Sequence, residues 1–211
     1  MMQKVIPAIL TSDPEDLRAK LQLFKGESEW MHIDIMDGKF VPSVSVSVRD
    51  LKEVGSDFRF EIHLMVQNPQ AYLEDCKAVG AGRIIIHQEA SVDIAKVLRE
   101  TKAYGLQIGI ALNPQTSIDV LAAFRNDIAL VLVMAIHPGS QGQEFMPSVL
   151  EKITIIKKEF PHLPIGVDGG VGEENISQIL QAGAEYVVVG SKIFNADDPV
   201  AVLKKLEKMV T

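Results

Sequence analysis

The sequence predicts one α/β domain over residues 1–211, folded as a (β/α)8 TIM barrel. The first observation is that apolar strand candidates alternate with connecting segments eight times along the chain. The second is that polar residues stand near the ends of these strands, where a barrel carries its chemistry. An open doubly wound sheet would instead gather its chemistry at one switch point. The length, with 47% hydrophobic residues, suffices for one large core.

Eight short apolar runs bounded by turn residues are the predicted strands. They cover residues 4–10, 30–36, 59–66, 83–88, 107–112, 129–136, 164–167 and 186–189. The first helical pattern begins at Ser12-Asp13-Pro14, where Ser12 or Asp13 can cap the helix and Pro14 fits its first turn. The next begins at Asn68-Pro69, and the others cover residues 92–104, 117–125, 147–160, 173–182 and 199–209.

Composition indicates which partners to expect. The net charge of −7 comes from scattered acidic residues, and no basic run could line a nucleic-acid groove. Cys76 is the only cysteine, so no intrachain disulfide can form and a reducing compartment is expected. The apolar run near the N-terminus is interrupted by Pro7 and is too short for a signal sequence or a membrane span. We therefore expect a cytoplasmic protein with no nucleic-acid or membrane partner.

The run over residues 30–36 is the strand on which the site is expected to be built. Its period of two places Trp30, His32, Asp34 and Met36 on one face, and the other face is entirely apolar. A strand of this kind is buried on both sides, with helices outside and a functional interior. His32 and Asp34 are therefore expected to project into one cavity.

Two further residues complete a candidate metal site. The same alternation turns His63 inward from the next strand, and Asp168 stands at the end of the seventh. Two imidazoles and two carboxylates suit a borderline divalent ion such as Zn, Fe, Mn or Co, and the sequence does not choose among them. A His-x-Asp pair alone is more often a hydrogen-bonded polar pair than a ligand set. Without a cation, at least one of the two buried carboxylates would be protonated.

Three glycine-containing loops predict a phosphate site. They follow the sixth, seventh and eighth strands and cover residues 137–143, 168–172 and 189–191. Glycine lets backbone amides approach an anion closely, and a helix starting near Glu173 or the short turn at Ser191 would add partial positive charge. Tight turns also need glycine, so each loop alone is weak evidence. Three neighbouring loops at the position where barrels bind phosphate favour a phosphate monoester.

Several motifs occur in a specific order along nearly the whole chain. They are His32-Ile-Asp-Ile-Met-Asp-Gly38 with Phe40-Val-Pro42, Ile62-His-Leu-Met65 with Asn68-Pro69, Ala111-Leu-Asn-Pro114, Val133-Met134 with Pro138-Gly139, Val167-Asp-Gly-Gly170, and Val189-Gly-Ser191 with Ile193-Phe194. With these motifs the chain resembles the ribulose-phosphate 3-epimerase family. The resemblance implies a barrel of the ribulose-phosphate-binding type, acting in carbohydrate metabolism and the pentose phosphate pathway.

The resemblance also implies roles for individual residues. Asp34 and Asp168 would be the acid/base pair, and one divalent metal ion per subunit would be held by His32, Asp34, His63 and Asp168. Three methionines would flank the reacting carbon, and glycine-rich loops would hold phosphate. The implied substrate-binding residues are Met36, His63, Met65, Met134, Gly139, Ser140, Gln141, Gly142, Gly169, Gly170, Gly190 and Ser191.

The chemistry of such a reaction fits these residue types. Inverting a carbon next to a ketone requires one carboxylate on each side of a planar enediolate. A metal ion would stabilise the developing negative charge and keep both carboxylates at usable pKa values. Methionines would form a polarizable wall with no competing proton, although ordinary core filling explains any single methionine equally well.

The chain departs from the family pattern at several positions. Ala8 stands in place of a serine, His137 in place of an asparagine, Ser140-Gln141 in place of Phe-Gly, and Gly166 in place of a glutamate. A segment after Ser43 is also shorter. These departures bear on substrate identity and efficiency, since they remove no predicted metal ligand or proton-transfer residue.

The favoured function is epimerisation at carbon 3 of a ketose phosphate, most simply D-ribulose 5-phosphate to D-xylulose 5-phosphate. A hexulose 6-phosphate such as allulose 6-phosphate would use the same chemistry, and a catalytically silent phosphosugar-binding homologue is the non-enzyme alternative. A decarboxylase is less favoured because related barrels of that type use a lysine among strand-end carboxylates. A homo-oligomer is possible, and Phe40 and Val41 are expected to be exposed in an interface or a lid.

Overall fold

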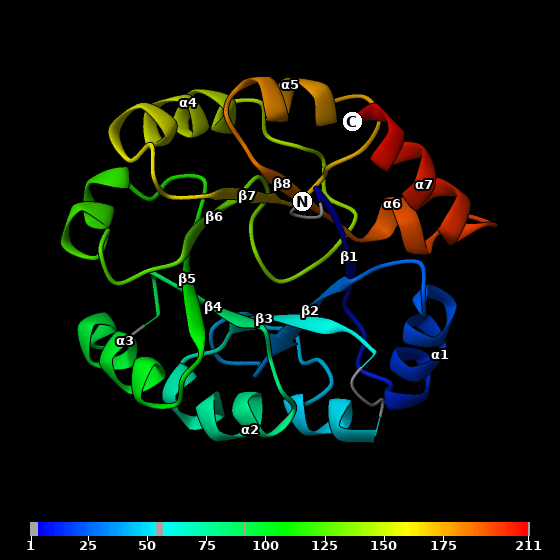
Figure 1. The fold of residues 1–211 in the computed structure, drawn as a ribbon, viewed down its shortest axis with the longest axis horizontal. Coiled ribbons are helices and arrows are strands. Elements are labelled where there is room, and N and C mark those ends of the chain that lie inside the picture. Colours follow the sequence, from blue (N-terminus) through cyan, green and yellow to red (C-terminus); the bar gives the residue numbers. More distant parts are fainter. Residues whose placement is uncertain (1–3, 54–56, 91, 211) are drawn as a thin grey trace.

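The computed structural model describes residues 4–53, 57–90 and 92–210. Within these residues eight parallel strands, hydrogen-bonded in sequence order, form a closed barrel with helices outside (Figure 1). The strands are β1 (Val5–Ile9), β2 (Trp30–Met36), β3 (Arg59–Met65), β4 (Arg83–His87), β5 (Gln107–Leu112), β6 (Leu130–Met134), β7 (Ile165–Asp168) and β8 (Tyr186–Val189). The predicted (β/α)8 barrel is therefore confirmed.

The outer layer consists of α-helices and short 3₁₀ helices. These are α1 (Pro14–Phe24), η1 (Val48–Glu53), η2 (Pro69–Tyr72), α2 (Leu73–Ala78), α3 (Ile94–Ala103), η3 (Ile118–Ala123), α4 (Val149–Glu159), α5 (Ile176–Gln181), α6 (Ser191–Phe194) and α7 (Pro199–Met209). Asp13 caps α1, because its side chain accepts a hydrogen bond from the amide of Glu15. Asp198 caps α7 in the same way through the amide of Ala201.

The period of two separates the outward and inward side chains of the strands into different apolar clusters. The larger cluster lies between strands and helices and includes the outward-facing Ile33 and Ile35 of β2. A smaller cluster fills the barrel interior and includes Trp30, Leu132 and Tyr186. Beyond Trp30, the inward residues His32 and Asp34 of β2 are polar within an apolar barrel, and they stand towards its carboxyl end, whereas Met36 packs with Val41 and Met65 in a third apolar cluster.

The strand register brings the predicted site residues to one end of the barrel. Asp34 pairs with His63 and Met36 with Met65 between β2 and β3. On the opposite side, Met134 pairs with Asp168 between β6 and β7. Residues from four strands thus gather at one end of the barrel.

Two helical predictions differ from the structure. The segment predicted as a helix over 173–182 becomes helical only at Ile176, because Asn175 is used to hold the preceding turn: its Oδ1 accepts from the Gly172 amide and its Nδ2 donates to the Gly170 carbonyl. The segment predicted over 117–125 is the 3₁₀ helix η3. The helix predicted to begin near Glu173 therefore begins at Ile176, whereas the short helix α6 begins at Ser191, the other position named for the phosphate site.

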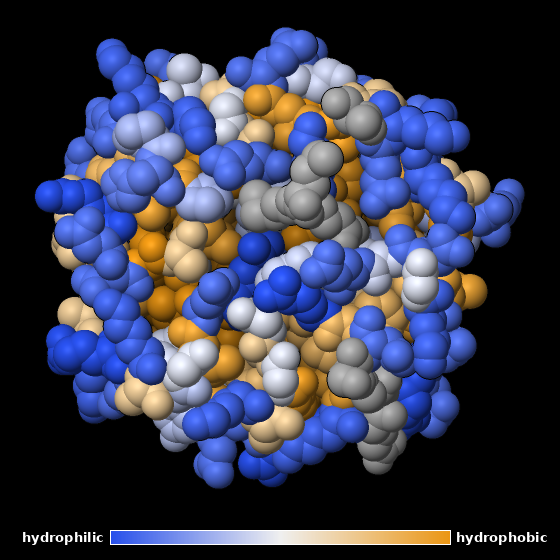
Figure 2. All heavy atoms as spheres, viewed as in Figure 1, coloured by the Kyte–Doolittle hydropathy of each residue, from blue (hydrophilic) through white to orange (hydrophobic). Residues whose placement is uncertain are grey.

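The surface in Figure 2 carries hydrophilic side chains around its rim, with apolar residues in the recesses between them. This distribution is expected for a β-barrel surrounded by helices whose polar faces are turned towards solvent. Among the described residues, no helix has the length and apolar character that crossing a bilayer requires.

Candidate active site

Two histidines and two aspartates converge at the carboxyl ends of β2, β3 and β7. The Oδ1 atom of Asp34 lies 3.2 Å from Nε2 of His32 and 3.0 Å from Nδ1 of His63, and these two nitrogens are 3.2 Å apart. Oδ2 of Asp168 stands 3.9 and 3.7 Å from the same nitrogens, too far for hydrogen bonds. The structure therefore brings together all four residues predicted as metal ligands.

The geometry of this cluster fits a metal ion. One ligand atom from each residue can be chosen so that all four lie within 4.8 Å of one another. Four ligands at about 2.1 Å from a tetrahedral ion would be about 3.4 Å apart, which is close to the spacings observed. Both histidines are fully buried, and Asp34 and Asp168 expose only 7% and 15% of their side chains. The nitrogen and oxygen donors suit a borderline divalent cation.

The remaining ring nitrogen of each histidine is also occupied. Nδ1 of His32 lies 2.6 Å from Oε1 of Glu61. Nε2 of His63 lies 2.9 Å from Nε2 of His87, whose Nδ1 lies 3.2 Å from Oε2 of Glu89. Each imidazole thus has one ring nitrogen in contact with a residue outside the cluster, and its other ring nitrogen faces the cluster. Sequence reasoning missed Glu61 and Glu89 as site residues, and it assigned no role in the site to His87.

The pKa values of the two carboxylates are shifted in opposite directions. Burial by itself raises the pKa of Asp34, but hydrogen bonds with His32 and His63 outweigh burial and hold this pKa well below its usual range. Burial raises the pKa of Asp168, and the neighbouring carboxylate of Asp34 raises it further against the opposing charge of His32. Asp34 is therefore the more readily ionised member of the pair, and Asp168 holds a proton more readily.

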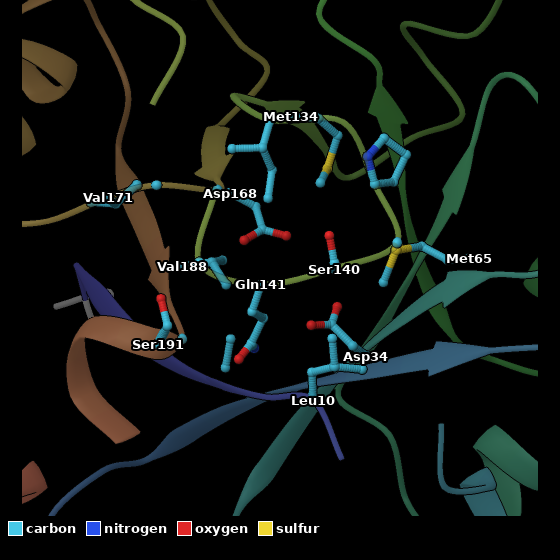
Figure 3. Close-up of a pocket in the computed structure, with 18 of the residues that line it drawn as sticks. Leu10, Asp34, Met65, Met134, Ser140, Gln141, Asp168, Val171, Val188 and Ser191 are labelled. Atoms are coloured by element: carbon cyan, nitrogen blue, oxygen red, sulfur yellow. The ribbon is translucent and has the colours of Figure 1, made fainter. Parts of the chain in front are cut away.

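A cavity opens next to the cluster. In Figure 3 the carboxylates of Asp34 and Asp168 point towards each other from opposite sides of it, with Met65 and Met134 beside them. The predicted residues that line it are Asp34, Met36, Met65, Met134, Gly139, Ser140, Gln141, Gly142, Asp168, Gly169, Gly170, Gly190 and Ser191. His63 was also predicted to contact substrate, but it lies in the cluster and is not among the lining residues. Ala8, Leu10 and Ile136 are lining residues that the prediction did not assign.

One end of the cavity is formed by backbone. Gly169 and Gly170 adopt φ values of 110° and 62°, which favour glycine. A Cβ atom on Gly170 would lie 2.5 Å from the amide nitrogen of Phe145, and one on Gly169 would overlap Ile136. These loops can approach each other and a ligand only because the side chains are absent. Such backbone is suited to an anion.

Gln141 projects across this end of the cavity. Its Nε2 lies 2.5 Å from where a Cβ atom on Gly190 would be, so the side-chain amide rests directly over that glycine. Figure 3 shows Gln141 between Ser191 and the two aspartates. The two-residue departure at Ser140-Gln141 therefore introduces a polar side chain into the cavity.

The loop after β2 packs against the loop that carries Gly139, and two of its residues are less exposed than predicted. Val41 is 6% exposed because it packs on Gly139, and Phe40 is half-buried with its ring 4.8 Å from the ring of His87. Ser43 anchors the loop by donating a 2.7 Å hydrogen bond to the carbonyl of Gly139. The prediction that Phe40 and Val41 are exposed is wrong.

His137 follows β6 by three residues. It is exposed and does not line the cavity.

The barrel carries its polar cluster at the carboxyl ends of the strands. This is where TIM-barrel enzymes place their reactive groups, above an interior that is otherwise packed with apolar side chains. The fold and the site thus define the class, a TIM-barrel enzyme.

Comparison with known proteins gives the family. The model of the ribulose-phosphate 3 epimerase family matches residues 4–194. The cytoplasmic isoform of ribulose-phosphate 3-epimerase from Oryza sativa is 36% identical over 214 residues, covering 98% of this chain and 94% of that protein. Ribulose-phosphate 3-epimerase from Bacillus subtilis is 35% identical, covering 93% of this chain and 94% of that protein. The chain belongs to this family, and it is an isomerase of the epimerase type.

The same fold occurs in a solved structure of much lower sequence identity. Orotidine 5'-monophosphate decarboxylase from Sulfolobus solfataricus matches with a TM-score of 0.68 and 17% identity, covering 99% of this chain and 98% of that chain. At this identity the likeness concerns the barrel alone.

Proposed function

We propose that this protein inverts carbon 3 of a ketose phosphate, interconverting D-ribulose 5-phosphate and D-xylulose 5-phosphate by two-base proton transfer. The observation that carries the proposal is the pair of carboxylates, Asp34 and Asp168, which point towards each other across one cavity. The names of the two relatives above support the choice of substrate.

The two aspartates would act on opposite faces of the sugar. An ionised carboxylate removes the proton from carbon 3, which leaves a planar enediolate, and a protonated carboxylic acid returns a proton to the other face. The opposite pKa directions of Asp34 and Asp168 supply one group in each state. In the reverse reaction the two groups exchange roles.

His32, Asp34, His63 and Asp168 would hold the divalent metal ion. When bound, the ion supplies positive charge that stabilises negative charge on the oxygens next to the reacting carbon. The chain's own contribution is orientation: each histidine is held by a hydrogen bond on the side away from the cluster. The identity of the ion among Zn, Fe, Mn and Co is left open by this donor set.

The rest of the cavity would bind and orient the substrate. Met36, Met65 and Met134 offer polarizable, proton-free walls beside the carboxylates. The phosphate group would lie against the backbone of the loops after β6, β7 and β8, where glycines permit close approach. Holding phosphate at one end fixes the distance from carbon 3 to the two carboxylates, which is the main benefit of a tethered substrate.

A hexulose 6-phosphate is the second candidate. Ala8 lines the cavity where a serine hydroxyl is expected by resemblance, and Gln141 introduces an amide nearby. Losing the serine hydroxyl and gaining the glutamine amide changes which hydroxyl groups of the sugar can form hydrogen bonds. Enzyme sites discriminate between substrates through such hydrogen bonds. A cytoplasmic location and a homo-oligomer remain predictions. The cytoplasmic one is supported by the name of the rice relative.

A panel of ketose phosphates tests the proposal. The metal-loaded protein is incubated in deuterated water with D-ribulose 5-phosphate, D-allulose 6-phosphate and, as a control for the phosphate group, D-ribulose. We expect rapid formation of D-xylulose 5-phosphate with deuterium at carbon 3, and much slower reaction of the control. Preference for the hexulose phosphate would favour the second candidate. Binding of sugar phosphate without any exchange would indicate a silent binding protein.

A further inference from the structure

A buried ionic group lies one layer deeper in the barrel than the metal cluster. It consists of Glu61 on β3, Arg83 on β4 and Tyr186 on β8, and Glu61 and Tyr186 have no exposed surface. Glu61 precedes His63 by two residues, so both point inwards from β3 at successive levels. The strand register places Glu61 beside His32 on one side and Arg83 on the other.

Both oxygens of Glu61 are engaged. Oε1 accepts from Nδ1 of His32 at 2.6 Å. Oε2 accepts from Nε of Arg83 and, at 3.0 Å, from the hydroxyl of Tyr186. A carboxylate with donors on both oxygens and an arginine beside it cannot rotate without losing a contact.

The arginine is itself held in place. Its guanidinium carbon lies 4.3 Å from the centre of the Trp30 ring and 4.7 Å from the centre of the Tyr186 ring. A planar cation between two aromatic faces is stabilised by cation–π attraction as well as by its ion pair. The position of Glu61 is therefore fixed from below, on the side away from the metal cluster.

Gly166 on β7 provides the space for Tyr186. The two residues are neighbours in the strand register. A Cβ atom on Gly166 would overlap the Tyr186 ring and would lie 2.5 Å from the hydroxyl oxygen. The glycine that stands where the family resemblance predicts a glutamate is thus the residue that allows the tyrosine to reach Glu61 across the barrel.

This arrangement determines the orientation of His32. Its Nδ1 donates to Glu61, so its Nε2 is turned towards Asp34 and the cluster, where it would serve as the metal ligand. Without that acceptor, the proton could reside on either nitrogen and the ring could turn over. An outer carboxylate of this kind orients a metal-binding histidine and raises its basicity.

We propose that Glu61, held by Arg83 and by Tyr186 in the space left by Gly166, is the positioning residue that fixes His32 for metal binding. This inference rests on the metal centre of the proposed function. His63 is held differently, because its outer partner is a second imidazole, His87. Among the residues that the structure describes, Glu61 is the carboxylate outside the cluster that directly contacts a proposed metal-binding histidine.

Metal affinity is the first readout. The full-length protein and three variants, Glu61→Gln, Tyr186→Phe and Glu185→Gln, are titrated with Zn²⁺ against a chromophoric chelator, after circular dichroism has shown that each is folded. Glu61→Gln is expected to bind Zn²⁺ about 10–100-fold more weakly, and Tyr186→Phe less weakly but in the same direction. Glu185→Gln is the control, because Glu185 pairs with Lys157 on the surface, and its affinity is expected to be unchanged.

Nitrogen NMR of the histidine rings is the second readout, and it needs no metal. The wild-type protein is expected to carry the His32 proton on Nδ1 whenever the ring is neutral, and Tyr186→Phe to carry a mixture. If Glu61→Gln is unfolded, Tyr186→Phe and this spectrum decide the question. Folded Glu61→Gln and Tyr186→Phe proteins with wild-type Zn²⁺ affinity and an unchanged His32 signal would overturn the proposal. Failure of the wild type to bind Zn²⁺ or Co²⁺ would overturn it too, whereas metal binding without epimerisation would contradict only the proposed function.

Discussion

The two halves of the cavity are built in different ways. The metal half consists of side chains from β2, β3 and β7, nearly all buried, and three of the four cluster residues are joined by hydrogen bonds of 3.0–3.2 Å. The phosphate half, where phosphate binding is proposed, consists mainly of backbone from the loops after β6, β7 and β8, with glycines at positive φ. One half depends on functional groups, and the other depends on the absence of side chains.

This difference predicts different consequences of mutation. Removing a functional group in the metal half takes away chemistry and is expected to lower kcat. Adding a side chain in the phosphate half disturbs fit and is expected to raise KM, because it weakens binding that the ground state and the transition state share. The following predictions test this contrast, from the largest expected effect to the smallest.

The largest effect is expected for the two aspartates. Asp34→Asn and Asp168→Asn each remove one proton-transfer group while keeping nearly the same shape. Epimerisation should fall about 1,000-fold or more in each variant, at the upper part of the range for general acid–base catalysis. The measurement is kcat, with circular dichroism to show that the barrel persists. Substantial activity in either folded, metal-loaded variant would contradict the two-base assignment.

Metal removal is expected to have the next largest effect. A chelator should lower kcat about 100-fold, because a metal ion contributes several kcal/mol of charge stabilisation. Adding back a divalent ion should restore activity. The phosphate half should be unaffected, so the affinity for inorganic phosphate, measured by calorimetry, should change little. A parallel loss of phosphate binding would mean that the two halves are not independent.

A smaller effect is expected in the phosphate half. Gly170→Ala places a Cβ atom 2.5 Å from the amide nitrogen of Phe145 and should raise KM about 10-fold, with a smaller change in kcat. Gly105→Ala is the matched control: Gly105 has a similar φ of 73°, but nothing lies within 4 Å of its Cβ position. Both substitutions strain the backbone by about 1–2 kcal/mol. Equal KM values in the two variants would show that strain, and not the loop contact, is responsible.

Sequence reasoning succeeded where a pattern is local. The strand β8 and the helix α7 have the predicted bounds because each is a short apolar or amphipathic run between clear turn or cap residues. The pairing of His32 and Asp34 on one face follows from the period of two alone. The barrel then brings His63 and Asp168 to the same end because all eight strands are parallel.

Sequence reasoning failed where a contact depends on closure of the barrel. Tyr186 and Glu61 are 125 residues apart and meet only across the interior, so no local pattern indicates their hydrogen bond. One signal was available: Glu61 and Arg83 are charged residues inside apolar strand runs, and such residues are rarely buried without a partner. The burial of Val41 and the late start of α5 also follow from contacts between loops that the sequence does not show.

The central claim is that the two carboxylates act on opposite faces of carbon 3. Metal-loaded Asp34→Asn and Asp168→Asn are each incubated in deuterated water with D-ribulose 5-phosphate and, separately, with D-xylulose 5-phosphate, and deuterium at carbon 3 is followed by NMR. We expect each variant to exchange the proton of one epimer without inverting it, and the two variants to act on different epimers. Exchange of the same epimer by both variants, or of neither although the metal is bound, would contradict the claim.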